Sequence, residues 1–272
     1  MGFLLLDISF KPFSAFLFTK PLYTDLKYLE LSFKPEVRCL VKIIILDLDM
    51  TLVDTLERFF IVYNRTREIF GLKKISRKDF IDYFRKDMLS QIIPENVDKV
   101  RFWRTFRTLY GTLFTEKDKP MKGALNVLKW LRENNYKIIV TTGREVDPEE
   151  IWAELRRYGI AEYIDEVYTI KQQKPEDEDI LFSRKGLLCQ IVEKYNVRPN
   201  EVVFVGDYWV DMEAGRAVGT TNVAVLTGLK DAKLLEKHGA HVVIEGIWEL
   251  PKVLTSLMQK NVAKEKRNKQ PK

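Results

Sequence analysis

The stretch from Val41 to Thr55 constrains the fold more than any other part of the chain. It reads VKIIILDLDMTLVDT. Its first six residues, ending at Leu46, are apolar except for one lysine, which is typical of a strand buried on both faces of a parallel sheet. Asp47 and Asp49 follow, and side chains two residues apart on an extended chain point the same way. Open α/β sheets bind ligands in the crevice beyond such strand ends, although acidic residues also follow strands in ordinary turns.

Composition limits the class of protein. A chain of 272 residues, 46% of them hydrophobic, suits a core domain with one smaller domain. Its two cysteines, Cys39 and Cys189, lie far apart, which disfavours both a disulfide framework and a zinc site and indicates a reducing cytoplasm. The net charge of +6 comes largely from residues 259–272, where six basic residues face one acidic residue. We predict that this basic tail is flexible and solvated, and that it does not bind nucleic acid.

Residues 1–40 have an unusual composition. They are rich in Phe and Leu, but Asp7, Lys11 and Pro12 interrupt the apolar run before it reaches the length of a membrane span. The pattern of a signal peptide is also missing. We therefore predict no membrane segment. We interpret residues 1–40 as an N-terminal extension ahead of a core that begins at Val41, with an added pair of strands as the alternative; the intact mass of the natively expressed protein would decide.

Residues 55–119 predict a small helical domain. Aromatic and other apolar residues recur there at helical intervals. They are most simply the core of this domain. Arg101, Arg104 and Arg107 share one predicted helix face, which is either a solvated surface or, if it projects over the crevice, a site for an anionic substrate.

From Met121 onward, helical and strand patterns alternate, which predicts an α/β fold with a doubly wound parallel sheet. The predicted strand Tyr136–Val140 ends in Thr141, Thr142, Gly143 and Arg144. A hydroxyl and backbone N–H groups at such a strand end are suitable donors to a phosphoryl oxygen. Thr141 alone could equally cap a helix.

A later strand, Glu201–Val205, also ends in acidic residues, Asp207 and Asp211. Like charges held close together in an apolar frame are unfavourable unless a cation or a shared proton intervenes. Carboxylate oxygens suit Mg²⁺. The sequence therefore predicts that Asp47, Asp49, Asp207 and Asp211 form a magnesium site.

These motifs, DLDMT at 47–51, Thr141, a lysine before the fourth strand and GDYWVD at 206–211, resemble those of the haloacid dehalogenase (HAD) superfamily of phosphohydrolases. The resemblance implies a Rossmann-like core at 41–54 and 120–258. It also implies a helical cap at 55–119, between the first and second motifs, as in the phosphoglycolate phosphatase branch.

The resemblance also implies roles for individual residues. Asp47 would be the nucleophile that forms an aspartyl phosphate, and Asp49 the general acid and base. Asp47, Asp49, Asp207 and Asp211 would hold Mg²⁺. Thr141, Thr142, Gly143 and a lysine would bind the phosphoryl oxygens. The spacing of the family's lysine favours Lys185, with Lys174 as the alternative.

The expected activity is Mg²⁺-dependent hydrolysis of a small phosphate monoester. A phosphomutase would share these residues, so it remains an alternative within the family. A noncatalytic binding module on the same fold is the alternative from another class, and hydrolysis of p-nitrophenyl phosphate with and without Mg²⁺ would separate it from an enzyme. The expected partner is a small phosphorylated metabolite. Neither the substrate nor the choice between monomer and homodimer follows from the sequence.

Overall fold

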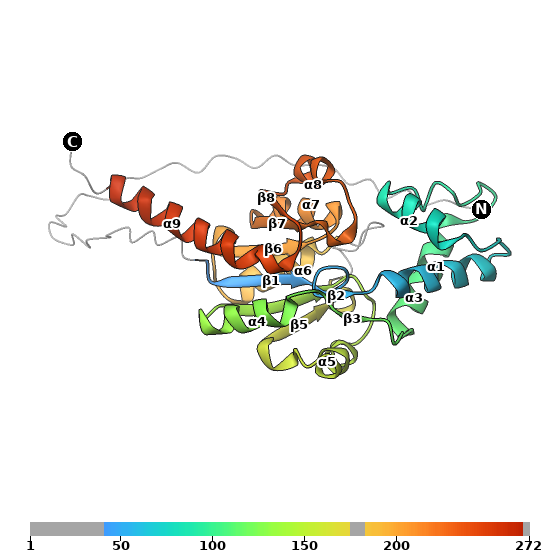
Figure 1. Cartoon of the computed structure of the whole chain (residues 1–272), viewed down its shortest axis with the longest axis horizontal. Coiled ribbons are helices and arrows are strands. Elements are labelled where there is room, and N and C mark those ends of the chain that lie inside the picture. The colour runs from blue at the N-terminus through green and yellow to red at the C-terminus, as the bar shows by residue number, and fades with distance from the viewer. Residues whose placement is uncertain (1–40, 175–182, 269–272) are drawn as a thin grey trace, which may run out of the picture. The chain divides into compact units, whose positions relative to one another are not determined.

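The computed structural model describes residues 41–174 and 183–268, and every element below lies in these ranges. Six parallel strands form one sheet in the order β5-β4-β1-β6-β7-β8 (Figure 1). The strands are β1 (Ile43–Asp47), β4 (Lys137–Thr142), β5 (Glu166–Thr169), β6 (Val202–Gly206), β7 (Thr221–Val225) and β8 (Val242–Ile244). The chain winds outward from β1 in both directions, which confirms the predicted doubly wound α/β fold.

Helices cover both faces of the sheet. On one face lie α4 (Ala124–Glu133), α5 (Pro148–Arg157) and α9 (Leu250–Asn268), and on the other lie α6 (Lys185–Lys194), α7 (Trp209–Val218) and α8 (Ala232–His238). Alternate residues of β1 face opposite layers. Ile44 and Leu46 belong to the hydrophobic core under α4, α5 and α9, and Ile43 and Ile45 belong to the core under α6 and α7. Burying each of these side chains stabilises the fold by about 1.5–3 kcal/mol. The central strand, and with it the position of Asp47, is therefore held from both sides.

The segment between β1 and β4 forms a helical cap. It contains α1 (Leu56–Ile69), α2 (Arg77–Arg85) and α3 (Lys99–Thr112). Ser76 and Asp98 accept hydrogen bonds from backbone N–H groups at the starts of α2 and α3, respectively. Where the chain leaves the core and returns to it, β2 (Val53–Asp54) pairs antiparallel with β3 (Lys119–Pro120). This two-strand connection ties the two ends of the cap together.

Aromatic side chains fill the interior of the cap. Tyr63, Phe80 and Phe102 are fully buried, and the rings of Phe59 and Phe106 lie 4.6 Å apart between centroids. The Tyr63 hydroxyl donates to the carbonyl of Leu89 at 2.8 Å, so its polar atom is satisfied within the cap. The aromatic stripes in the sequence are thus the cap's own core, as predicted.

The C-terminal segment differs from the expected flexible tail. Helix α9 continues to Asn268, so residues 259–268 are helical in the structure. The segment MQKNVAKEKRN lacks Gly and Pro and is rich in good helix formers, which explains why the helix continues. The predicted N-terminal extension, residues 1–40, lies outside the described residues.

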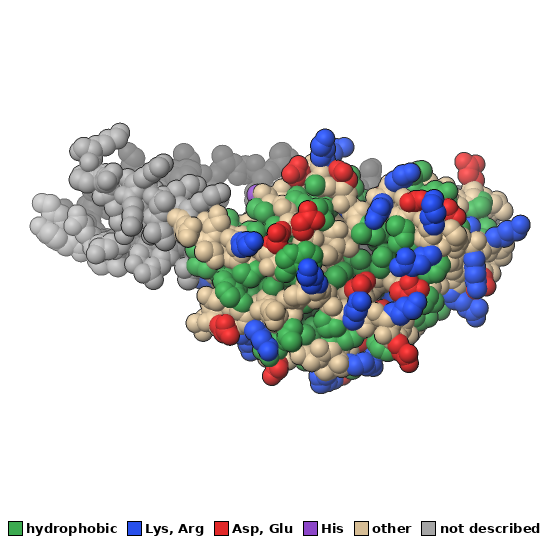
Figure 2. Space-filling model, in the orientation of Figure 1, with side chains coloured by type: hydrophobic (Ala, Val, Ile, Leu, Met, Phe, Trp, Pro, Cys, Tyr) green, Lys and Arg blue, Asp and Glu red, His purple; other side chains and the backbone are tan. Residues whose placement is uncertain are grey.

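Two further observations concern the surface. In the described ranges, no helix combines the length and the apolar character needed to cross a membrane. On the face shown in Figure 2, Lys and Arg side chains are interspersed with Asp and Glu side chains.

Candidate active site

Three buried carboxylates meet at the carboxyl end of the sheet. Asp47 ends β1, Asp207 follows β6 directly, and Asp211 lies in the first turn of α7. Strands β1 and β6 are paired in parallel register, with Leu46 opposite Val205, so their ends are neighbours. Carboxylate oxygens of the three aspartates all lie within 4.8 Å of one another. The structure therefore brings together three of the four acids that the sequence assigns to a metal site.

Glycines allow this close approach. A Cβ atom at Gly206 would lie 2.8 Å from the Cβ of Asp211, and one at Gly228 would lie 2.6 Å from the Cβ of Asp207. Both distances are too short for ordinary contacts between carbon atoms. Glycine is therefore needed at both positions, which lie next to Asp211 and Asp207.

The electrostatics of Asp47 and Asp207 indicate a cation site. Burial raises the pKa of Asp47, and the guanidinium of Arg184 opposes this effect. Burial and the neighbouring Asp47 carboxylate raise the pKa of Asp207 well above its usual value. Buried carboxylates this close together are stabilised in the ionised form by a cation, and an all-oxygen donor set suits Mg²⁺. The residues present thus fit the predicted metal.

Arg184 provides a positive charge inside the cluster. Its Nη1 donates to Asp47 Oδ1 at 2.5 Å, and its Nη2 donates to Asp211 Oδ1. Its side chain is 8% exposed. Arg184 lies immediately before α6 and was missed in the sequence because only lysines were considered at this position.

The two candidate lysines lie elsewhere. Both Lys185 and Lys174 are exposed, and neither side-chain amine contacts an acid of the site within the described residues. The adjacent basic pair in the sequence SRKG at 183–186 was the available signal, because an arginine can supply the same charge as a lysine. Among the described residues, the cation that contacts Asp47 and Asp211 is Arg184.

The segment Thr141–Gly143 ends β4 beside Asp47. Thr141 is opposite Asp47 in the β1–β4 register, and its buried hydroxyl has no hydrogen-bond partner within the described residues. A buried hydroxyl without a partner is unfavourable, so it is suited to donate to a ligand oxygen. Thr142 instead donates to Asp49 Oδ2 at 3.1 Å. Gly143 has open space where a Cβ would be.

A tight turn follows Asp49 directly. Met50 has a left-handed backbone conformation (φ 60°), and the Met50 N–H donates to the carbonyl of Val53 at 2.7 Å. Left-handed backbone is uncommon for a residue with a side chain and tends to occur at functional sites.

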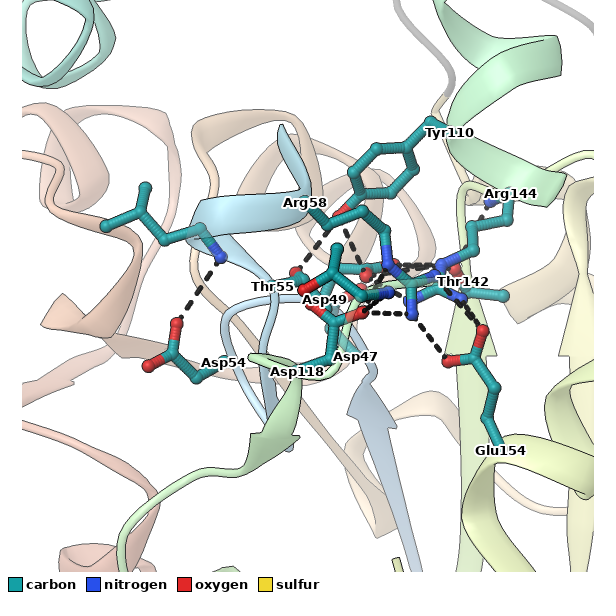
Figure 3. A network of polar contacts seen from close by, with 12 residues as sticks. Asp47, Asp49, Asp54, Thr55, Arg58, Tyr110, Asp118, Thr142, Arg144 and Glu154 are labelled. Carbon is teal, nitrogen blue, oxygen red and sulfur yellow. Dashed lines mark hydrogen bonds and ion pairs between the residues drawn. The ribbon is translucent and has the colours of Figure 1, made fainter. Parts of the chain in front are cut away.

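Asp49 is held by a ring of donors. Arg144 Nε donates to its carboxylate at 3.0 and 3.2 Å and Arg144 Nη2 at 2.5 Å, while Tyr110 of α3 donates at 2.9 Å (Figure 3). Burial alone would raise the pKa of Asp49, but the charge and hydrogen bonds of Arg144 outweigh it and lower the pKa to about 2. Asp49 is consequently ionised at neutral pH, and Arg144 is occupied by Asp49 rather than directed at a phosphoryl oxygen.

The same network continues into the cap. Glu154 of α5 accepts from Arg144 Nη1 at 2.8 Å and from Arg58 of α1 at 3.1 Å, and Arg58 Nε also donates to Asp118 at 2.7 Å. Acidic and basic groups therefore alternate from Asp49 to the segment where the chain returns from the cap (Figure 3). Sequence reasoning missed this network because members in direct contact are separated by up to 96 positions along the chain.

The parallel sheet, the acids after β1 and β6, and the cap between β1 and β4 together define an α/β protein of the HAD type. The family described as haloacid dehalogenase-like hydrolase matches residues 44–225. This range is well over half of the chain, and the chain belongs to that family. The resemblance inferred from the motifs is thus confirmed.

Individual relatives are distant. Pyrophosphatase PpaX from Bacillus pumilus is 23% identical over 218 residues, which cover 77% of this chain and 94% of that protein. A solved haloacid dehalogenase-like family hydrolase from Streptococcus pneumoniae has a TM-score of 0.64 at 17% identity, covering 78% of this chain and 98% of its own. A structure titled a predicted phosphoglycolate phosphatase from Haemophilus somnus has a TM-score of 0.61 at 20% identity, covering 80% and 99%. At such identities the solved structures show a shared fold.

Proposed function

We propose that this chain is a magnesium-dependent phosphatase that hydrolyses a small phosphorylated metabolite through an aspartyl phosphate on Asp47. The observation that carries the proposal is the convergence of Asp47, Asp207 and Asp211 within 4.8 Å, with Arg184 between Asp47 and Asp211. A nucleophilic carboxylate, oxygen ligands for a metal and a fixed positive charge are the parts that phosphoryl transfer requires.

Each residue has a distinct task in this proposal. The Asp47 carboxylate attacks phosphorus, and the bond between phosphorus and the leaving oxygen breaks. The Thr141 hydroxyl and the Arg184 guanidinium donate to the phosphoryl oxygens, whose charge must be balanced during transfer. Asp49, which is ionised in this arrangement, takes a proton from the water that hydrolyses the intermediate. To protonate the leaving oxygen in the first step, Asp49 would have to separate from Arg144 and take up a proton. In the second step the bond between phosphorus and Asp47 breaks as the water attacks.

Mg²⁺ would be held by the carboxylates of Asp47 and Asp207 and the backbone carbonyl of Asp49, with Asp211 in support. When bound, it supplies charge neutralisation for the transferring phosphoryl group.

The substrate class rests on the relatives and on the surface. PpaX is named a pyrophosphatase, and one solved neighbour is titled a phosphoglycolate phosphatase. On the face shown in Figure 2, basic and acidic side chains are mixed, so this face lacks the concentration of basic side chains that is typical of nucleic-acid-binding surfaces. A small phosphate monoester or a diphosphate is therefore the proposed substrate.

Hydrolysis of p-nitrophenyl phosphate tests the proposal. We expect turnover with Mg²⁺, loss of turnover with EDTA, and recovery when Mg²⁺ is added in excess. Asp47→Asn should lower kcat by at least about a thousandfold, because the nucleophile is lost. Asp82→Asn is the matched control, since Asp82 is a half-exposed surface residue of α2 paired with Lys78.

A screen of small phosphate monoesters, sugar phosphates, nucleotides and pyrophosphate would then identify the substrate. If purified protein with Mg²⁺ hydrolyses none of these compounds, or if Asp47→Asn remains as active as Asp82→Asn, the proposal is wrong. The noncatalytic module would then be the better explanation.

A further inference from the structure

One carboxylate of the cap is bound by three side chains of the core. Asp87 follows helix α2 and has a left-handed backbone conformation (φ 57°). It accepts hydrogen bonds from the Tyr208 hydroxyl at 2.9 Å, from Trp209 Nε1 at 2.8 Å and from Lys230 Nζ at 3.1 Å. Three donors, one of them charged, are thus directed at a single anion.

These donors lie next to the acid cluster. Tyr208 and Trp209 follow Asp207 directly in the sequence. Lys230 follows the short helix Leu226–Gly228. This helix packs closely against Asp207, because a Cβ at Gly228 would clash with the Asp207 side chain. The group of three donors therefore borders the site where the phosphoryl group would bind.

Lys230 is an unusual lysine. Its side chain is only 3% exposed, and Nζ lies 4.4 Å from the centre of the Phe84 ring and 5.1 Å from that of Tyr208. It also donates to the backbone carbonyl of Phe84. A buried ammonium group loses much of its hydration, so it needs an anionic partner. Here that partner is Asp87, whose own side chain is 34% exposed.

We propose that Tyr208, Trp209 and Lys230 form a subsite for a second anionic group of the substrate, and that Asp87 occupies it when no substrate is bound. The inference rests on the proposed phosphatase function and narrows its substrate class. A compound with one phosphate for Asp47 and a second phosphate or carboxylate for this subsite would displace the Asp87 carboxylate. A carboxylate and a phosphate oxygen accept the same kinds of hydrogen bonds, so Asp87 can take the place of either.

Competition experiments test the subsite. Inorganic pyrophosphate and 2-phosphoglycolate, each with a second anionic group, are measured as inhibitors of p-nitrophenyl phosphate hydrolysis at constant free Mg²⁺. The readout is the ratio of the inhibition constant to the KM for p-nitrophenyl phosphate, which has no second anionic group. Lys230→Met should raise this ratio at least tenfold, because a charged hydrogen bond to the inhibitor is lost. The control Lys233→Met removes an exposed lysine nearby and should leave the ratio unchanged.

Asp87→Asn gives the second arm and distinguishes a subsite from a simple contact between cap and core. Without the Asp87 carboxylate, the inhibitor no longer has to displace an anion from the subsite. The ratio should therefore fall several-fold, opposite in direction to the effect of Lys230→Met. If Lys230→Met does not fold, Tyr208→Phe, which removes only the hydroxyl that donates to Asp87, should raise the ratio in its place.

Three results would overturn the inference: neither inhibitor competes in the wild-type enzyme, Asp87→Asn and the donor variants change the ratio in the same direction, or no variant changes it. Which inhibitor is affected more identifies the second group as phosphate or carboxylate. Failure of the proposed function is a separate result, because the wild-type protein would then not hydrolyse p-nitrophenyl phosphate at all.

Discussion

Replacement of Arg144 by glutamine should destabilise the protein in a way that depends on pH. In the wild type, Arg144 lowers the pKa of Asp49 from 3.8 to about 2 against the opposing effect of burial. A shift of nearly two units corresponds to roughly 2–3 kcal/mol, at about 1.4 kcal/mol per unit. Because this pKa is lower in the folded state, the stabilisation is present above pH about 4 and is lost as the pH falls toward 2.

The variant should show the opposite dependence. Without Arg144, Asp49 and Glu154 each lose a cationic partner. Leaving a buried charge uncompensated costs about 3–5 kcal/mol. Burial then raises the pKa of Asp49, so protonation relieves the penalty as the pH falls. The difference in stability between wild type and Arg144→Gln should therefore be largest near pH 7 and smaller near pH 4.

Urea unfolding at pH 7, 5 and 4 measures this difference. With an m-value of about 3 kcal/mol/M for a domain of this size, the midpoint should fall by about 1–2 M at pH 7. Arg156→Gln is the matched control, because Arg156 pairs with Glu149 on an exposed surface and should hardly move the midpoint. Arg144→Gln combined with Glu154→Gln should recover part of the loss. A midpoint for Arg144→Gln equal to that of the control, or a difference that grows as the pH falls, would refute the reasoning.

Two further predictions concern the acid cluster. Arg184→Ala should lower kcat by about 10²–10³, the usual effect of removing one donor to a developing negative charge, whereas Lys185→Ala should keep most of the activity. Steady-state kinetics of the two variants decide between these neighbouring cations. A larger loss in Lys185→Ala than in Arg184→Ala would return the role to Lys185. Gly228→Ala should raise the Mg²⁺ concentration needed for half-maximal activity, because the new Cβ would lie 2.6 Å from the Cβ of Asp207 and force Asp207 to move. A Mg²⁺ titration of activity measures this concentration. An unchanged value would show that Asp207 does not depend on the space at Gly228.

Local sequence patterns were sufficient for the fold. The apolar run before Asp47 predicted a central buried strand, and the alternation after Met121 predicted the doubly wound sheet, because hydrophobic periodicity depends on which faces an element buries. The aromatic intervals between 55 and 119 likewise predicted a helical cap with its own core. In contrast, the C-terminal charges suggested a flexible tail, but helix propensity continues α9 to Asn268.

The site was only partly accessible from the sequence. Asp47 and Asp207 could be assigned because each ends a recognisable strand, and parallel strands place their ends at one edge of the sheet. The sequence by itself determined the sheet, the cap and the acids that meet there. Only the tertiary structure showed that Arg184 reaches Asp47, that Arg144 holds Asp49, and that Asp87 meets Lys230 across 143 positions of the chain. Long, flexible charged side chains can extend in many directions, and their partners are set by packing rather than by sequence spacing.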